Sequence, residues 1–462
     1  MQTNESRIKV LAETPVLKAI LTMSLPVILA MVVQVLYNMV DTFFIGLMND
    51  VNQLAAANLG FPFFMITMAA GSVIGVGASS AISRYLGMQK KKEAGEMVAL
   101  SFALVAMLGV AFTVVGLVFF EPVLALLGAR DGVIMPTRDY LLPLIIGAVA
   151  IMGNFSIGVT LRAEGAALDT TIGMIIGSVV NIILDPVMIF TLGWGIAGAA
   201  WATVIGNLAG LLWYIRCYAV KSIIKPSFGP HIWRRQYLRE ILSIGIPSGL
   251  NQGLMSVSGI ITNNLAATYG AVILGAMGVA SKVNSLIILI LVGLAAGCQP
   301  LFGFNYGAKN KKRLVALLKT SMILAFCIGS VMLAIYTLAG KYMIAAFSSI
   351  PEVVAQGSYI LKAMSCAAPF IGIIMITMNS LQAMGKAIPS LILSTGRQGL
   401  YYIPLLFILN AIFGFHGFVF TQAIVDVLMV FTATLMLRYV VHHDPVLHGT
   451  DKPDAAQKSA EA

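Results

Sequence analysis

The sequence predicts an all-α polytopic membrane protein, in which twelve transmembrane helices form two six-helix bundles related by a pseudo-twofold axis. Three observations support this fold class. The chain is 59% hydrophobic and only 10% charged, long apolar runs recur along nearly all of its 462 residues, and its second half repeats a pattern found in its first. Because soluble domains carry roughly 25% charged residues, a surface this apolar must face lipid.

Twelve apolar runs, separated by Gly, Pro and charge clusters, are the predicted membrane spans. A barrel strand crosses a membrane with about 10 residues, whereas a helix needs about 20. These runs have helical length, and helices and closed barrels are the only backbones that span lipid. The expected spans cover residues 19–46, 54–82, 96–120, 141–161, 171–190, 195–218, 241–267, 272–304, 314–338, 358–381, 389–412 and 417–438.

Basic residues gather in one set of alternate loops, which sets the expected orientation. That set holds Arg84, the run 90–92, the run 309–313 and most charges of the segment 220–240, while the other set is nearly devoid of Lys and Arg. Cytoplasmic loops carry the excess of positive charge. We therefore expect a multi-pass protein of a bacterial-type cytoplasmic (inner) membrane with both termini in the cytoplasm. The net charge of +10 then reflects topology, and no nucleic-acid partner is expected.

An internal repeat divides the chain. When the two halves are aligned, Gly77 and Gly87 match Gly297 and Gly307, 220 residues later in the sequence. Other matches follow at nearly the same separation. Six spans per repeat is an even number, so the repeats are parallel and their axis lies along the membrane normal. We predict four segments, which are an N-terminal six-helix lobe at 1–219, a cytoplasmic linker at 220–240, a C-terminal six-helix lobe at 241–440 and a polar tail at 441–462.

Glycine pairs at small-xxx-small spacing, such as Gly173 with Gly177 and Gly293 with Gly297, are interpreted as close helix packing within one molecule. The chain is therefore expected to function as a monomer in the lipid bilayer. Its four cysteines are scattered without metal or redox spacing. No nucleophile–base pair is evident either, so we expect neither an enzyme nor a bound cofactor or metal.

Two acids, Asp41 and Asp185, fall deep within predicted spans, where an ionisable residue costs several kcal/mol and indicates function. Both spans run in the same direction, and each acid lies on a polar stripe along one helix face. Such a carboxyl would bind a proton. Together with carbonyl and amide oxygens it would instead form a Na⁺ site, at Asp41, Asn181 and Asp185. The alternative is that Asp41 ends the first helix and Asp185 caps a break at Pro186. The candidate coupling residues are Asp41, Asp185, Asn181, Thr203, Tyr37 and Asn154.

The second repeat lacks these acids, since Thr262 stands at the position of Asp41 and Leu405 at that of Asp185. Asp426 is its deep acid, and it is as compatible with a structural role as with a functional one. Arg397 is a deep cation that either lines a cleft or pairs locally. The candidate substrate-cleft residues are Met31, Gln34, Asn38, Gln252, Ser256, Asn263 and Arg397.

Several runs resemble motifs of the multidrug and toxic compound extrusion (MATE) family, whose fold is the MOP type. They are residues 38–46 (NMVDTFFIG), 161–165 (LRAEG), 181–186 (NIILDP) and 195–200 (GIAGAA). For the DinF-like branch, the resemblance implies an N-lobe cation site at Asp41, Asn181, Asp185 and Thr203, with Tyr37 and Asn154 nearby. The NorM-like branch uses acids of the C-lobe, whereas its span-7 glutamate position falls here on Met255.

The expected function is secondary active antiport, in which amphipathic or cationic organic compounds leave the cell (multidrug efflux) against inward flow of H⁺, or of Na⁺. In this view Asp41 and Asp185 bind either ion or substrate, and Pro26 lets the first span bend. The alternative is a flippase for a lipid-linked oligosaccharide or another lipid-like substrate. That function favours a strongly cationic cleft, but Lys282 and Arg397 are the deep cations of this sequence.

Overall fold

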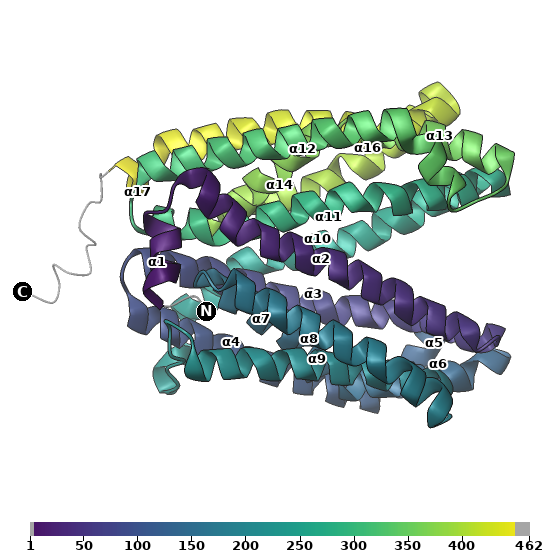
Figure 1. Cartoon of the computed structure of the whole chain (residues 1–462), viewed down its shortest axis with the longest axis horizontal. Helices are drawn as coiled ribbons and strands as arrows, with labels where there is room; N and C mark the ends of the chain where they lie inside the picture. Colours follow the sequence, from purple (N-terminus) through teal and green to yellow (C-terminus); the bar gives the residue numbers. More distant parts are fainter. Residues whose placement is uncertain (1–3, 449–462) are drawn as a thin grey trace, which may run out of the picture.

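The computed structural model describes residues 4–448, and all regular structure within that range is helical. Figure 1 shows the helices running roughly parallel to the long axis of the molecule. The α-helices are α1 (Asn4–Ala12), α2 (Val16–Leu47), α3 (Val51–Gly87), α4 (Lys91–Val118), α5 (Phe120–Leu126), α6 (Ile134–Ile146), α7 (Ala148–Ala163), α8 (Ala167–Pro186), α9 (Gly195–Val220), α10 (Arg235–Thr268), α11 (Ala271–Gly307), α12 (Lys311–Ala345), α13 (Pro351–Ser365), α14 (Ala368–Ala383), α15 (Ala387–Thr395), α16 (Tyr402–His443) and α17 (Pro445–His448). Short 3₁₀ segments are η1 (Asp131–Val133) and η3 (Pro230–Trp233), and π-helical turns are η2 (Val187–Thr191) and η4 (Gly396–Leu400).

Each of the twelve predicted spans coincides with helical structure. Within the described residues, eight helices are long and apolar enough to cross a membrane, and the bent pairs α6/α7 (51°) and α13/α14 (47°) add two more. One of the eight, the run Ala387–His443, contains two predicted spans, because the backbone of Gly414 is non-helical (φ 58°). The twelfth span is α10, which is long enough but carries several amide and hydroxyl side chains.

The internal repeat is visible in the backbone. Gly165 and Gly385 adopt positive φ of 86° and 75°, and Gly195 and Gly414 adopt 54° and 58°. These pairs lie 220 and 219 residues apart, and only a residue without a Cβ enters this region at no steric cost. The two bent pairs also occupy corresponding places in the two halves. The repeat in the sequence is thus a repeat of local geometry.

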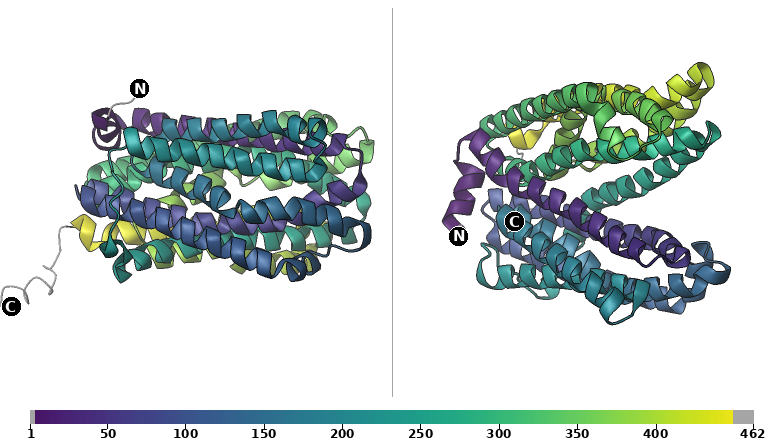
Figure 2. Two further views of the ribbon diagram at one scale, coloured as in Figure 1. Left: turned by 90° about the horizontal axis from the view of Figure 1, so that it is seen from below. Right: turned by 45° about the vertical axis from the view of Figure 1, so that its right-hand side comes forward.

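The first membrane-spanning helix of each half packs against the second one of the other half. These contacts are α2 on α11 and α10 on α3. The halves meet closely at one end and diverge toward the other, which gives the V shape in Figure 2. Glycines make the contact close, since a Cβ on Gly87 would overlap the carbonyl oxygen of Phe304, and one on Gly307 would overlap that of Arg84. The two glycines are repeat-related, so the contact has approximate twofold symmetry.

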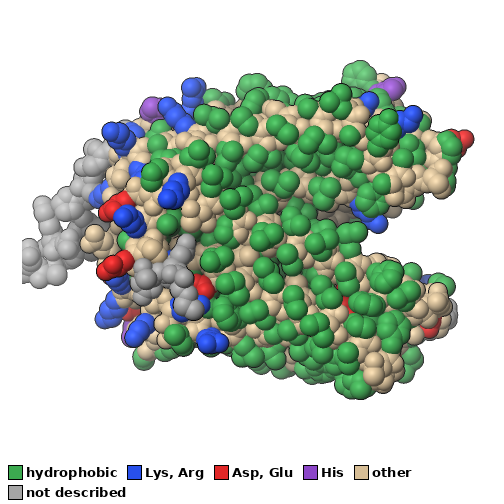
Figure 3. Space-filling model, in the orientation of Figure 1, with side chains coloured by type: hydrophobic (Ala, Val, Ile, Leu, Met, Phe, Trp, Pro, Cys, Tyr) green, Lys and Arg blue, Asp and Glu red, His purple; other side chains and the backbone are tan. Residues whose placement is uncertain are grey.

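The surface separates into an apolar band and a charged end. Figure 3 shows hydrophobic side chains over most of the visible face and Lys and Arg gathered where the halves meet. Large apolar side chains such as Leu338, Phe431 and Leu435 are more than 60% exposed, as lipid-facing residues are. We call the end where the halves meet the charged end, and the opposite end, where Figure 3 shows a notch between them, the open end.

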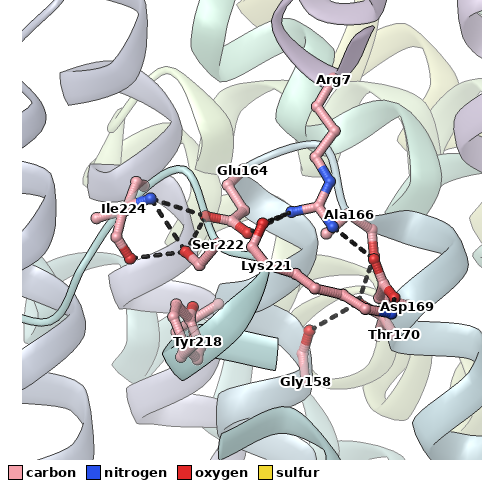
Figure 4. A network of polar contacts seen from close by, with 11 residues as sticks. Arg7, Gly158, Glu164, Ala166, Asp169, Thr170, Tyr218, Lys221, Ser222 and Ile224 are labelled. Atoms are coloured by element: carbon pink, nitrogen blue, oxygen red, sulfur yellow. Dashed lines mark hydrogen bonds and ion pairs between the residues drawn. The ribbon is translucent and has the colours of Figure 1, made fainter. Parts of the chain in front are cut away.

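The short helix α1 is fixed to the N-terminal half by a buried network at the charged end (Figure 4). Arg7 is 1% exposed, and its guanidinium donates to Glu164 Oε1 (2.9 Å) and Asp169 Oδ2 (2.5 Å). It also donates to the carbonyl of Lys221 at 3.1 Å. Buried charges are tolerated when they are paired in this way.

The same helix and the turn after it are also fixed to the C-terminal half. Asn305 Nδ2, near the end of α11, donates to the carbonyl of Leu11 at 3.0 Å. Arg313 Nη2, at the start of α12, donates to the carbonyl of Thr14 at 2.6 Å. Helix α1 therefore bridges the two halves across the charged end.

The predicted tail begins as helix. Helix α16 continues to His443 and α17 follows, while residues 449–462 lie outside the described part of the chain. The start of the tail is anchored, because the Asp444 carboxylate accepts from Tyr306 (2.7 Å) and pairs with Lys386 (2.8 Å).

Candidate functional site

Helices α2 and α8 pack against each other and place Asp41 and Asp185 in one region of the N-terminal half. Asp185 is fully buried, and it directly precedes Pro186, where α8 gives way to the π-helical η2 because proline has no backbone N–H to donate. Asp41 lies six residues before α2 ends at Leu47. It therefore lies within the helix rather than at its end.

Both carboxyl groups have an oxygen without a partner. Asp41 Oδ1 and Asp185 Oδ1 are buried and accept no hydrogen bond from any described residue. Native proteins rarely leave buried polar atoms in this state. Two unsatisfied carboxyl oxygens in one region are what a proton or a small cation would satisfy.

Asn181 ties Asp185 to α9. The orientation of its amide follows from its neighbours, with the oxygen accepting from the backbone N–H of Thr203 (3.1 Å) and the nitrogen donating to Asp185 Oδ2 (3.3 Å). Asn181 and Asp185 share a face because they are one helical turn apart. The predicted coupling residues Asp185, Asn181 and Thr203 are therefore in contact.

A second amide extends this group. Asn154 on α7 donates to Asn207 Oδ1 (2.9 Å), and Asn207 donates to the carbonyl of Thr203 (2.8 Å). Asn154 Oδ1 is buried without a partner among the described residues. The sequence analysis identified Asn154 but not Asn207, which lies one turn after Thr203 on the same face of α9.

Two tyrosines adjoin the acids. Tyr37, one turn before Asp41 on α2, is within electrostatic reach of both carboxyls. Tyr140 on α6 is also in reach of both carboxyls and of Tyr37, although the sequence analysis did not identify it. Its ring packs closely on Gly60 of α3, where a Cβ would overlap it, a contact between helices that the sequence does not signal.

An apolar cluster covers this polar region on the side of the open end. It contains Ile45, Ile189 and Ile196, with Phe44 and Tyr140 packed against it. Ile45 and Ile189 lie one turn beyond Asp41 and Asp185, and Ile196 precedes Thr203 on a helix that runs the opposite way. The carboxyls are thus separated from the open end by hydrocarbon, which strengthens every electrostatic interaction among them.

The position equivalent to Asp41 in the C-terminal half is uncharged and fully hydrogen-bonded. Thr262, at the position of Asp41, hydrogen-bonds to the Tyr402 hydroxyl at 2.8 Å and donates to the carbonyl of Ser258 at 2.7 Å. The two halves therefore share a backbone plan but differ in chemistry at the corresponding place.

The buried acid and the buried cation of the C-terminal half pair with each other, whereas Lys282 is exposed. Arg397, within η4, donates from Nε to Asp426 Oδ1 (2.7 Å) and from Nη2 to Asp426 Oδ2 (3.3 Å). Asp426 is fully buried and Arg397 is 8% exposed. Gln422 also donates to Asp426 Oδ1, at 3.2 Å. Arg397 thus forms a local pair, and its predicted role in a substrate cleft stays a prediction.

This buried pair leads to a stability prediction. Replacing one member leaves the other buried and uncompensated, which costs about 3–5 kcal/mol, whereas an apolar pair of similar volume is often neutral. We expect Asp426→Leu to lower the apparent melting temperature of the purified protein. The single variant should also lose efflux as it unfolds, and the double variant Arg397→Met/Asp426→Leu should restore both the melting temperature and efflux. A double variant as unstable as the single one would contradict this account.

The other predicted cleft residues lie on α2 and α10, the first membrane-spanning helix of each half. Met31, Gln34 and Gln252 are half-buried, while Asn38, Ser256 and Asn263 are exposed. The Ser256 hydroxyl donates to the carbonyl of Gln252. Their contact with substrate stays a prediction.

Comparison with known proteins identifies the chain. The model of the family described as MatE matches it twice, at residues 26–187 and 247–408. The chain belongs to the MatE family. The two matches begin 221 residues apart (247 − 26), in agreement with the internal repeat.

Relatives of this MatE protein align over nearly their whole length. Multidrug export protein MepA of Staphylococcus aureus (strain MSSA476) is 31% identical over 92% of this chain and 94% of its own. MepA of Staphylococcus haemolyticus (strain JCSC1435) is 29% identical over the same shares. A solved outward-facing structure of a multidrug resistance MATE transporter of the MOP superfamily has a TM-score of 0.88 and 28% identity, covering 94% of this chain and 98% of the other.

These findings confirm the family and the two-lobed, twelve-span fold predicted from the sequence. A MatE chain is a membrane transporter rather than an enzyme. Its assignment to the DinF-like branch stays a prediction.

Proposed function

We propose that this MatE protein is a secondary active antiporter that exports amphipathic, often cationic, organic compounds in exchange for inward H⁺, with Na⁺ as the alternative coupling ion. The observation that carries the proposal is the pair Asp41 and Asp185, each with a buried unpartnered oxygen, in one half of a repeated fold. The relatives named multidrug export proteins support the substrate class.

Competition for the carboxyls provides the coupling. An organic cation and a proton cannot both neutralise the same carboxylate. Protonation from outside therefore releases the cation, and loss of the proton to the cytoplasm lets the carboxylate bind the next cation. For an uncharged substrate, one proton moving through 100 mV supplies about 2.3 kcal/mol, and since about 1.4 kcal/mol is worth a factor of ten, this maintains a concentration ratio of about 50-fold. For a monovalent cation exchanged one for one, no net charge crosses the membrane, so the pH gradient drives export, by about tenfold per pH unit.

The two candidate ions make different demands on the same residues. Na⁺ would take the carboxylate oxygens of Asp41 and Asp185 together with the Asn181 amide oxygen, which are hard donors suited to hard cations. That oxygen already accepts from the Thr203 N–H, which favours the proton. Transport of a fluorescent organic cation in proteoliposomes, under a H⁺ gradient alone and a Na⁺ gradient alone, tests the choice. If neither gradient drives uptake of the cation, the proposed antiport is wrong.

The flippase alternative has less support. A lipid-linked oligosaccharide carries a pyrophosphate, which needs unpaired cations in the cleft. Of the two deep cations named above, Arg397 is already neutralised by Asp426, which leaves Lys282 as a single candidate.

We further propose that the charged end faces the cytoplasm of a bacterial-type inner membrane, since positive charge marks the cytoplasmic side. In a background without native cysteines, Leu126→Cys, the last residue of α5 at the open end, should react with an impermeant thiol reagent added outside intact cells. Phe228→Cys, between α9 and α10, should react only after the membrane is opened. Both wild-type side chains are well exposed, at 86% and 65%. The reverse labelling pattern would contradict this orientation.

A further inference from the structure

The C-terminal half contains a cavity of about 310 Å³ between α10, α11, α13, α16 and η4. Small-molecule sites begin at about 300 Å³, so the cavity has room for one or two aromatic rings. Thr262 lies on its wall, at the position that Asp41 holds in the other half. The cavity is thus the counterpart, in the second repeat, of the acidic region in the first.

Its wall carries no charged side chain among the described residues. Arg397 and Asp426, both buried, neutralise each other, and Gln422 stands between this pair and the cavity. Lys282, next to the lining residue Ser281, is exposed and is not part of the wall. An ion entering the cavity would lose its hydration without meeting an opposite charge, which is costly. The cavity therefore disfavours ionic groups.

The wall instead combines amides with soft apolar side chains. Asn263, Gln398 and Gln422 present groups that both donate and accept hydrogen bonds. Met277, Met364 and Phe418 supply thioether and ring contacts that suit aromatic ligands. This wall fits an uncharged aromatic group that carries a carbonyl, an ether or a hydroxyl.

We propose that this cavity is a subsite for uncharged aromatic compounds that carry a carbonyl, an ether or a hydroxyl. The inference rests on the proposed export function and divides recognition between the halves. The acids of the N-terminal half respond to charge, and the cavity of the C-terminal half selects neutral, hydrogen-bonding rings.

Gly259 offers a direct test, because it lines the cavity and a Cβ placed on it would meet no atom within 4 Å. Gly259→Leu should therefore fill the cavity without displacing the helices. Gly253, on the same helix, is outside the cavity wall and also has no atom within 4 Å of an added Cβ. Gly253→Leu is the matched control, since both changes remove a glycine from the same helix.

The measurement is equilibrium binding to purified protein, with 7-methoxycoumarin as the neutral probe and tetraphenylphosphonium as the cationic probe. Gly259→Leu should weaken coumarin binding by about tenfold or more, because the added side chain occupies the space that the ring needs. It should change tetraphenylphosphonium binding by less than about threefold. Gly253→Leu should change neither. Ser281→Leu fills the cavity from α11 and should reproduce the result if Gly259→Leu is poorly folded.

Unchanged coumarin binding in both cavity variants, equal loss of both probes, or no coumarin binding by the wild type would each overturn the subsite. These outcomes are separate from failure of the proposed function. Binding is measured without a gradient, whereas antiport fails when the wild type shows no gradient-driven movement of the cation.

Discussion

Asp41→Asn and Asp185→Asn should each reduce gradient-driven efflux to the background of cells without the transporter, while membrane expression stays near normal. Each change keeps the size of the side chain but removes its proton equilibrium. The affected oxygens are buried and unpartnered, so the change breaks no ion pair in the structure. Removing a buried charge need not destabilise a protein and can stabilise it.

The measurement is dye efflux from energised cells across a range of external pH, with expression followed in parallel. Asp50→Asn is the matched control, because Asp50 caps α3 by accepting from the backbone N–H groups of Asn52 and Gln53, and asparagine caps a helix about as well. Asp50→Asn should transport like the wild type. Wild-type efflux with unchanged pH dependence in both site variants would show that the two carboxyls are structural.

Gly87→Ala and Gly307→Ala should shift the conformational equilibrium away from the open-ended V. In each variant the new Cβ would overlap a backbone carbonyl of the opposite half, and backbone cannot rotate away as a side chain can. Overpacking of this kind costs typically about 1–3 kcal/mol, which changes an equilibrium by about 5- to 150-fold. Efflux should fall because the halves no longer close at the charged end.

Spin labels at Leu126→Cys and Ile350→Cys, one at the open end of each half, report the shift as a distance distribution by pulsed electron resonance. Both glycine variants should move the population toward shorter distances. Gly253→Ala is the control, because it also replaces a helical glycine and its Cβ meets no atom within 4 Å. A wild-type distribution in both glycine variants would show that this contact does not govern the equilibrium.

The twelve spans and the repeat could be predicted because they depend on local composition and on spacing along the chain. The sequence also brought Asn181 and Asp185 together, since one helical turn determines their common face. It did not identify α1, which is too polar to be a span, or the bends within α6/α7 and α13/α14, which interrupt continuous apolar runs.

Contacts between helices were harder to predict. Tyr140 reaches the acids from α6, and at the end of a predicted span a tyrosine is also typical of a membrane interface. Asn207 lacks a charge that would mark it as costly in lipid. The pairing of Arg397 with Asp426 joins spans whose rotation about their own axes no sequence period determines. These contacts depend on which faces meet, and a single sequence does not contain that information.

The bridge formed by α1 has a consequence for the order of assembly. A ribosome makes Arg7 before its partners Glu164 and Asp169, which follow 157 and 162 residues later, and Leu11 waits 294 residues for Asn305. At a synthesis rate of roughly 5–20 residues per second, α1 spends many seconds outside its final position. Helix α1 can dock on the N-terminal half once residue 169 has been made, but its bridge to the C-terminal half is completed only after α11 has been synthesised.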